Sequence, residues 1–339
     1  MRKVGLRMML YSNRAVMLAV GAVCVMCAAP STPPPVIVAP VDVGTPTGDA
    51  GQGAIVVPKV VPPPRIALVL GGGGARGFAH IGVLRVLEQE KIPIDLIVGT
   101  SVGSLIGALY AAQPNSFELE WTAFRIEKQD LFDFSVFSAA TGPVKGEAVR
   151  EFMRRNCTKQ KIEDFAVPFV AIATDLNSGR RLEIDRGSIV DAVRASVSIP
   201  GVFTPAVING RTYVDGGVVA NLAVDVAKKR GADIIVAVNI TEDVTNNDVT
   251  DVVSIIMQSI NIMMSEMAAT QLRDADVVIA PPIGGVGTLD FSQKKLCVKA
   301  GIEATRRAVP QIRGAVRKYY ETRGGVDPAT LPAARAAAF

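Results

Sequence analysis

The chain has 339 residues, of which 49% are hydrophobic and 20% charged, so it can bury a substantial core in one large or two small domains. Its net charge of +4 comes entirely from Arg2, Lys3, Arg7 and Arg14, because the first 29 residues contain no acidic residue. The remainder is formally neutral, and charge therefore gives no support to a nucleic-acid-binding function.

Residues 1–29 have the composition of an export signal. After the basic residues, an uncharged apolar stretch runs to Ala29; it is short for a membrane span of about 20 residues and suits a signal peptide. Cys24 and Cys27 leave open lipid attachment, as in a bacterial lipoprotein, and an uncleaved apolar anchor is the third alternative. We therefore expect a protein exported to the bacterial cell envelope, either periplasmic or membrane-anchored.

The rest of the chain divides into a linker, a folded domain and a tail. Residues 30–64 hold nearly half of the chain's 21 prolines and almost no charge, a composition that predicts an extended linker. The folded domain is expected over residues 65–322, with its motifs within 65–240 and C-terminal helices within 249–322. Residues 323–339 are expected to form a flexible tail.

From Arg65 onward, apolar runs suited to buried strands alternate with helical patterns. Strands are predicted at residues 65–72, 94–100, 168–174, 212–217 and 233–240. Helices are predicted between them at residues 77–90, 101–112, 189–197 and 221–229. Nearly continuous β-branched strands separated by helices are typical of parallel sheets covered on both faces. The pattern therefore predicts an α/β domain with a mostly parallel sheet.

Two features of the expected domain leave alternatives open. Long helical patterns are predicted at residues 252–275 and 292–320, and the first contains the Met-rich stretch "IIMQSINIMMSEM". Such a stripe most often packs in the core, but it could also face lipid, since Met adapts to irregular apolar partners. Cys157 and Cys297 are the only cysteines of the expected domain, and a disulfide between them is conceivable in an oxidising compartment.

A glycine loop, "GGGGARGFAHIG", runs from Gly71 to Gly82 directly after the first predicted strand. A loop at this place usually holds a phosphate or an oxyanion. A P-loop is excluded because Phe78 and Ala79, rather than Lys and Ser or Thr, follow the last glycine of the run. A dinucleotide site expects an acidic residue at the end of the second strand, whereas this strand ends in "GTSVG".

This second sequence is a G-x-S-x-G motif, with Ser101 between Gly99 and Gly103. It lies between a predicted strand and a predicted helix, which is the setting of a nucleophile elbow: glycines leave space around a serine that projects from a tight turn. The amino terminus of the following helix offers amide donors and a positive dipole end. The motif in this position therefore predicts a nucleophilic serine.

The glycine loop then has a function in acyl transfer. The unhindered backbone amides of Gly72, Gly73 and Gly74 could point at a developing oxyanion, which in a site without water is worth several kcal/mol. Arg76, in the same loop, would steady it or add positive potential. A glycine-rich turn without any ligand is the alternative interpretation.

The general base of such a site is expected to be a carboxylate. His80 is the chain's single histidine and so the only candidate for a Ser-His-Asp triad, but its place inside a predicted helix favours packing in the core or behind the site. Asp215 ends a predicted strand and precedes two glycines, which let another backbone approach. An aspartate within reach of Ser101 could accept its proton directly. Asp175, at another strand end, is the rival.

The motifs "GGGARG", "GTSVG" and "DGG", in this order, resemble those of the patatin-like phospholipases. The stretch "RASVSIPGVFTPAVING" also resembles the segment that this family carries before its catalytic aspartate. The resemblance covers roughly residues 65–240 and implies a three-layer α/β/α fold with a mostly parallel central sheet and additional C-terminal helices. One departure is Gly71, where many members of the family have Asp.

The resemblance also implies the chemistry of a serine lipid acyl hydrolase. Ser101 would be the nucleophile that carries the acyl group, and Asp215 the proton acceptor. The substrate would be a phospholipid, a lysophospholipid or another lipid ester at a membrane surface, without metal, cofactor or nucleic acid. A non-catalytic lipid-binding or scaffold protein with the same fold is the alternative from another class, and nucleotide binding by the loop is a third. The sequence does not fix the head group, the position of the ester or the oligomeric state.

Overall fold

The computed structural model describes residues 61–133, 144–241, 244 and 249–328, all of which belong to one unit, Val56–Phe339. The expectations for the export signal, for residues 30–60 of the linker and for residues 329–339 of the tail lie outside the described residues. Within the described residues, no helix combines the length and the apolar character that crossing a membrane requires.

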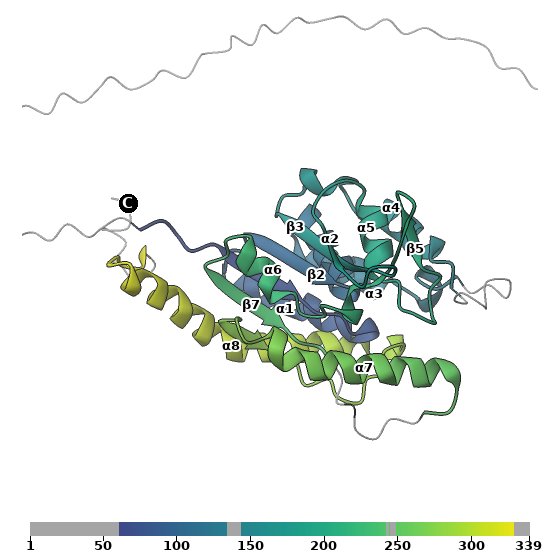
Figure 1. The fold of residues 1–339 in the computed structure, drawn as a ribbon. Coiled ribbons are helices and arrows are strands. Elements are labelled where there is room, and N and C mark those ends of the chain that lie inside the picture. Colours follow the sequence, from purple (N-terminus) through teal and green to yellow (C-terminus); the bar gives the residue numbers. More distant parts are fainter. Residues whose placement is uncertain (1–60, 134–143, 242–243, 245–248, 329–339) are drawn as a thin grey trace, which may run out of the picture. The chain divides into compact units, whose positions relative to one another are not determined.

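Eight strands form one sheet in the described part of the chain (Figure 1). Five neighbouring strands run parallel, in the order β3 (Phe169–Asp175), β2 (Leu96–Thr100), β1 (Ile66–Leu70), β7 (Ile234–Val238) and β8 (Val277–Ile279). Beyond β3 the pairing is antiparallel, with β6 (Arg211–Asp215), β5 (Ala206–Ile208) and β4 (Arg181–Ile184). The predicted mostly parallel sheet is confirmed, while β4, β5 and β8 were not predicted.

Six of the described helices follow the prediction closely. The predicted helices correspond to α1 (Phe78–Gln89), α2 (Val102–Ala112), α5 (Ile189–Ser196), α6 (Val224–Lys229), α7 (Val252–Gln271) and α8 (Lys294–Thr322). Two further helices, α3 (Ser116–Phe124) and α4 (Glu147–Asn156), were missed. In α3, Phe117 and Trp121 are exposed to solvent, so its apolar residues do not mark one buried face.

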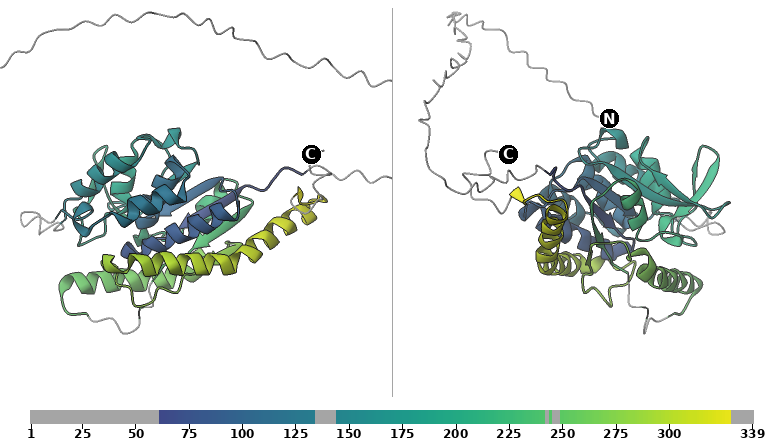
Figure 2. Two further views of the ribbon diagram at one scale, coloured as in Figure 1. Left: turned by 180° about the vertical axis from the view of Figure 1, so that it is seen from behind. Right: turned by 60° about the vertical axis from the view of Figure 1, so that its left-hand side comes forward.

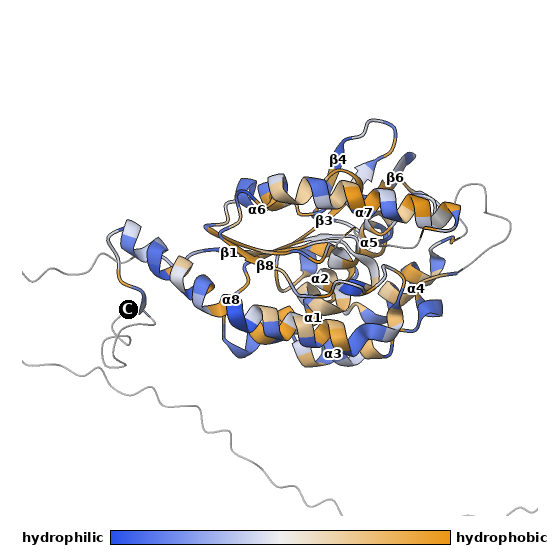
Figure 3. Cartoon of the chain, turned by 90° about the horizontal axis from the view of Figure 1, so that it is seen from below, coloured by the Kyte–Doolittle hydropathy of each residue, from blue (hydrophilic) through white to orange (hydrophobic). Residues whose placement is uncertain are grey.

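Helices cover both faces of the sheet, because successive residues of a strand point to opposite sides. In β1, Ile66, Leu68 and Leu70 belong to the cluster that contains α1, α2 and α8. Ala67 and Val69 belong to a second cluster with α6 on the other face. Every residue of β1, β2 and β7 is buried, and Figure 3 shows hydrophobic strands between the helices. The predicted three-layer α/β/α fold is confirmed.

The long helix α8 runs beside α1 (Figure 2). At the contact the two backbones touch, because a Cβ atom added to Gly82 would overlap the carbonyl oxygen of Val298. In the same way, a Cβ atom on Gly301 would overlap the carbonyl oxygen of Ala79. Glycine is therefore required on both helices at this contact, and α8 is an integral part of the fold.

The Met-rich helix α7 is buried on one face only, so the interpretation as core holds for part of its apolar residues. Met264 is 6% exposed and packs toward the domain, whereas Met263 next to it is 44% exposed. Ile255 and Ile262 are exposed as well. One face of α7 is therefore core, and the other face leaves apolar side chains uncovered in the described structure.

The conceivable disulfide between Cys157 and Cys297 is not formed. Both residues are buried and both are free thiols. Burial raises the pKa of Cys297 to about 11 and also raises that of Cys157, so both thiols stay protonated at neutral pH. They act as small apolar side chains of the core.

Candidate active site

The glycine loop and the G-x-S-x-G turn lie side by side at the carboxyl ends of β1 and β2. The register of the two strands pairs Leu70 with Gly99, so the residues that follow each strand meet at the same edge of the sheet. This edge is where parallel α/β sheets bind their ligands. The predicted neighbourhood of the two motifs is therefore present.

Ser101 occupies a strained turn between β2 and α2. Its backbone has φ 55° and ψ −126°, a conformation that costs a non-glycine residue of the order of 1–3 kcal/mol. The flanking glycines are sterically required, because a Cβ atom on Gly99 would lie 2.5 Å from the carbonyl oxygen of Gly103, and one on Gly103 would overlap that of Leu70. This is the geometry of a nucleophile elbow.

Asp215 ends β6 and shares a cavity of about 350 Å³ with Ser101. One carboxylate oxygen, Oδ1, accepts a hydrogen bond of 2.7 Å from the Gly217 amide. The other, Oδ2, is buried and accepts no hydrogen bond from the described residues. Burial raises the pKa of Asp215 to about 6, and interactions with the Ser101 hydroxyl and the Gly217 amide oppose this rise. The carboxylate thus has one oxygen free to take a proton.

The glycine loop lies against Ser101, but its three amides are not equivalent. A Cβ atom on Gly72 would lie 3.0 Å from that of Ser101, and the Gly72 amide already donates to Asn221 Oδ1 at 2.8 Å. The amides of Gly73 and Gly74 have no acceptor among the described residues, and both glycines line the cavity of Ser101. Two donors are therefore available for an oxyanion.

Arg76 steadies the loop from behind. It is fully buried and donates to the carbonyl oxygen of Val286 at 3.3 Å and to Asn261 Oδ1 at 3.4 Å. Val286 precedes α8 and Asn261 belongs to α7, so the guanidinium joins the loop to two distant segments. It does not line either of the two cavities at Ser101. Of the two functions considered for Arg76, its contacts favour the steadying one.

His80 and Asp175 lie outside the group formed by Ser101 and Asp215. His80 is fully buried in α1, with Nε2 2.8 Å from the carbonyl oxygen of Gly71, and burial lowers its pKa to about 4 despite this hydrogen bond. Asp175 accepts hydrogen bonds of 3.0 Å from the amides of Asn177 and Ser178. Asp175 thus caps the turn after β3, and neither residue lines a cavity at Ser101.

Two buried polar residues at the site were missed by the sequence analysis. Asn221 is fully buried and holds the Gly72 amide from a position 149 residues away. Ser196, also fully buried, accepts a hydrogen bond of 2.9 Å from the backbone amide of Ser101. Nothing in the local sequence marks these contacts, because each depends on the packing of distant segments.

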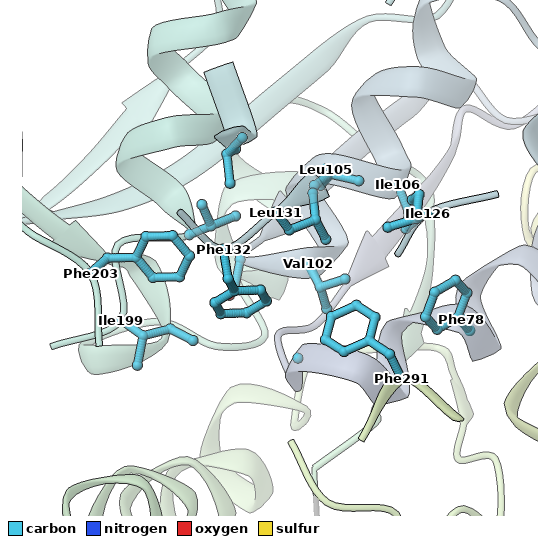
Figure 4. A pocket seen from close by; sticks show the side chains of 14 residues that line it. Phe78, Val102, Leu105, Ile106, Ile126, Leu131, Phe132, Ile199, Phe203 and Phe291 are labelled. Carbon is cyan, nitrogen blue, oxygen red and sulfur yellow. The ribbon is translucent and has the colours of Figure 1, made fainter. Parts of the chain in front are cut away.

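A second, larger cavity of about 580 Å³ opens from Ser101 (Figure 4). Its walls are aromatic and aliphatic side chains from several separate segments, and no charged residue lines it in the described structure. The lining includes Phe78, Leu105, Ile126, Phe132, Val149, Phe203 and Phe291. The cavity shares Gly74, Ser101 and Ile199 with the smaller one, so Ser101 lies where the two meet. Such a cavity suits a hydrocarbon chain.

Among the residues that the structure describes, no group of three or more His, Cys, Asp or Glu side chains could hold a metal ion. The polar side chains that line the two cavities are instead those of Ser101, Asp215, Asn261 and Thr288.

The fold and the site define an α/β protein with a serine at a strained strand-to-helix turn beside a glycine loop. Residues 68–228 match the model of the family described as patatin-like phospholipase. The resemblance to the patatin-like phospholipases that the motifs predicted is therefore confirmed over these residues.

The similarity to individual relatives extends over only part of each chain. An uncharacterized NTE family protein of Mycobacterium tuberculosis is 34% identical over 177 residues, which are 52% of this chain and 49% of that protein. The lysophospholipase nte1 of Aspergillus fumigatus is 37% identical over 179 residues, 52% of this chain and 12% of that protein. The chain thus spans about half of the first relative and a small part of the second.

Among solved structures, VipD from Legionella pneumophila is similar with a TM-score of 0.51 at 14% sequence identity. The match covers 73% of this chain and 66% of VipD. At this identity the likeness concerns the fold alone. It agrees with the sheet and the covering helices described above.

Proposed function

We propose that the chain is a serine lipid acyl hydrolase, a phospholipase, lysophospholipase or esterase that uses Ser101 and Asp215 as a catalytic dyad. The observation that carries the proposal is the position of Ser101, at a strained elbow between a buried carboxylate and an apolar cavity of about 580 Å³. The match of residues 68–228 to the patatin-like phospholipase model and the similarity to a protein named lysophospholipase support a lipid ester as the substrate.

In the first half of the reaction, Ser101 Oγ attacks the ester carbonyl carbon and Asp215 Oδ2 accepts the hydroxyl proton. The carbonyl oxygen becomes an oxyanion, which the amides of Gly73 and Gly74 stabilise with hydrogen bonds. When the intermediate collapses, the bond to the leaving alcohol breaks and Asp215 returns the proton to that alcohol. The acyl group remains on Ser101 as an ester.

In the second half, water attacks the acyl-enzyme while Asp215 accepts one of its protons. The tetrahedral intermediate uses the same two amides and collapses to the free fatty acid, and Asp215 returns the proton to Ser101 Oγ. Because its pKa is about 6, Asp215 is ionised at neutral pH yet more basic than an ordinary aspartate. No histidine is needed for either half.

Each of the two cavities binds a different part of the substrate. The larger cavity has apolar walls throughout, so it accepts the hydrocarbon chain of the acyl group. The smaller cavity contains Asp215 and the glycine loop, and the leaving alcohol faces it, within reach of the proton on Asp215. The ester group itself would lie at Ser101, which lines both cavities.

A fluorophosphonate probe tests the nucleophile directly. Ser101 Oγ is expected to displace fluoride from phosphorus and to label the full chain with one probe per molecule, while Ser101→Ala is unlabelled and has no esterase activity. Thermal melting checks that the variant is folded. Failure of the folded wild-type protein to react, both alone and with lipid vesicles, would contradict the proposal and favour a non-catalytic lipid-binding protein.

The larger cavity predicts a chain-length effect. Val149 lines it, and Val149→Phe adds a ring to an already close-packed wall, which shortens the space for a hydrocarbon chain. We expect kcat/KM for a long-chain p-nitrophenyl ester to fall about tenfold relative to a butyrate ester, since a pocket commonly distinguishes substrates by 1–3 kcal/mol. The ratio of the two substrates corrects for any loss of folded enzyme. An unchanged ratio would mean that the acyl chain binds elsewhere.

A further inference from the structure

The backbone amide of Ser101 is held by a hydroxyl group and is not directed at the oxyanion site. Ser196 is the last residue of α5, and its Oγ accepts a hydrogen bond of 2.9 Å from this amide. The same Oγ lies 2.6 Å from the carbonyl oxygen of Ile172 in β3. Ser196 is fully buried. A single side chain therefore connects the backbone of the nucleophile to the central sheet.

The direction of both hydrogen bonds is fixed by the chemistry of the partners. A carbonyl oxygen can only accept, so the Ser196 hydroxyl must donate its proton to Ile172. Its lone pairs are then turned toward Ser101, whose amide can only donate. One hydroxyl satisfies both groups, and a side chain without a hydroxyl leaves both of them buried and without a partner.

The two sides of the elbow are supported differently. The carbonyl oxygen of Ser101 accepts from the amides of Ser104 and Leu105 and from Ser104 Oγ at 2.6 Å, so helix α2 holds it several times over. On the amide side, Ser196 is the only acceptor among the described residues. The strained φ of 55° at Ser101 is the torsion next to this amide. Loss of the Ser196 hydroxyl therefore removes the hydrogen bond that holds the Ser101 amide, which is the less supported side of the elbow.

We infer that Ser196 is a positioning residue for the proposed acyl transfer. Through its bond to Ile172 it fixes the backbone of Ser101 relative to β3, the strand that also pairs with Asp215 through Ala173. The hydroxyl thus keeps the nucleophile at the correct distance from its base. This inference rests on the proposed function, because positioning matters only if Ser101 and Asp215 react together.

The test compares side chains of equal shape with and without the hydroxyl. Ser196→Thr retains the group and Ser196→Val lacks it, so any cost of the added methyl groups is shared by the pair. We expect the Val variant to label with fluorophosphonate, and to turn over ester, roughly ten- to a hundredfold more slowly than the Thr variant, as when a buried donor loses its partner. The KM should change little, because Ser196 does not line either cavity.

Thr305→Val is the matched control. Thr305 is fully buried in α8, and its hydroxyl donates to the carbonyl oxygen of Gly301 at 2.7 Å, away from the site. We expect this variant to lose thermal stability but to keep the wild-type labelling rate per folded molecule. Equal labelling rates for the Thr and Val variants at position 196, per folded molecule, would overturn the inference while leaving the proposed function intact. An unreactive wild-type protein would instead overturn the proposed function.

Discussion

Asp215→Asn is expected to lower kcat/KM by at least about 10³ and, at neutral pH, to stabilise the folded protein. The loss of activity follows because an amide cannot accept the proton of Ser101, and removal of a general base usually costs 10²–10⁴-fold or more. Steady-state hydrolysis of a long-chain ester measures it. In the wild-type protein, kcat/KM should rise with pH through about pH 6, where Asp215 loses its proton.

The gain in stability follows from the sign of the pKa shift. Burial raises the pKa of Asp215 from 3.8 to about 6, so between these values the folded protein keeps a proton that the unfolded chain has lost. The wild-type protein therefore loses stability as pH rises through this window, by roughly 3 kcal/mol. The Asp215→Asn variant has no group that titrates at this position, so its stability does not fall in this pH range for this reason. Melting curves should separate the two proteins at pH 7 and bring them together near pH 4.

Asp175→Asn provides the matched control, because Asp175 also ends a strand. Hydrogen bonds from Ser178 and Asn177 and the nearby Arg211 hold the pKa of Asp175 below its usual value although burial opposes this. Its replacement should therefore leave catalysis nearly unchanged and should not stabilise the protein at neutral pH. Full activity in Asp215→Asn, or loss of activity in Asp175→Asn alone, would show that the base has been assigned to the wrong aspartate.

Gly301→Ala is expected to destabilise the protein by about 3 kcal/mol, the upper part of the usual range for an overpacked contact. The new methyl group would overlap the carbonyl oxygen of Ala79, so α8 would have to move away from α1. Denaturant unfolding monitored by circular dichroism measures the change. A value within about 0.5 kcal/mol of zero, a margin typical of surface substitutions, would contradict the packing described here.

Gly314→Ala tests the same substitution on the same helix without the contact. Nothing lies within 4 Å of the position that its Cβ atom would occupy, and alanine favours a helix over glycine by about 0.5–1 kcal/mol. We therefore expect Gly314→Ala to be neutral or slightly stabilising. Since Gly301 lies beyond residues 68–228, which match the family, the pair also tests the prediction that the folded domain continues to residue 322.

Most of the sheet could be predicted because its central strands are buried on both faces. The apolar runs of β1, β2, β3 and β7 stand out from the sequence between them. By contrast, β5 and β8 have only three residues each, and every residue of β4 is partly exposed, so no apolar run marks them. Helix α3 was missed for a related reason, since Phe117 and Trp121 are exposed to solvent and interrupt the pattern of a single buried face.

The catalytic candidates could also be predicted from the sequence, because the turn around Ser101 requires particular residues close to it in the chain. The turns require glycines on both sides of Ser101 and after Asp215 for steric reasons. Such a requirement is visible in the sequence because the residues concerned lie within a few positions of each other. The supports of the site are different. Ser196 reaches Ser101 across 95 residues and Asn221 reaches Gly72 across 149, and only the packed fold brings them together. The same holds for the apolar cavity, whose walls come from separate segments.

The burial of His80 makes the protein simple to study by spectroscopy. It is the single histidine of the chain, and with a pKa of about 4 its imidazole stays neutral throughout the physiological range. A kinetic ionisation near pH 6 can therefore be assigned to a carboxyl group without interference from a histidine. The imidazole of His80 is hydrogen-bonded to Gly71 at the start of the glycine loop. Its NMR resonances, which no other histidine obscures, therefore report how that loop responds when substrate binds.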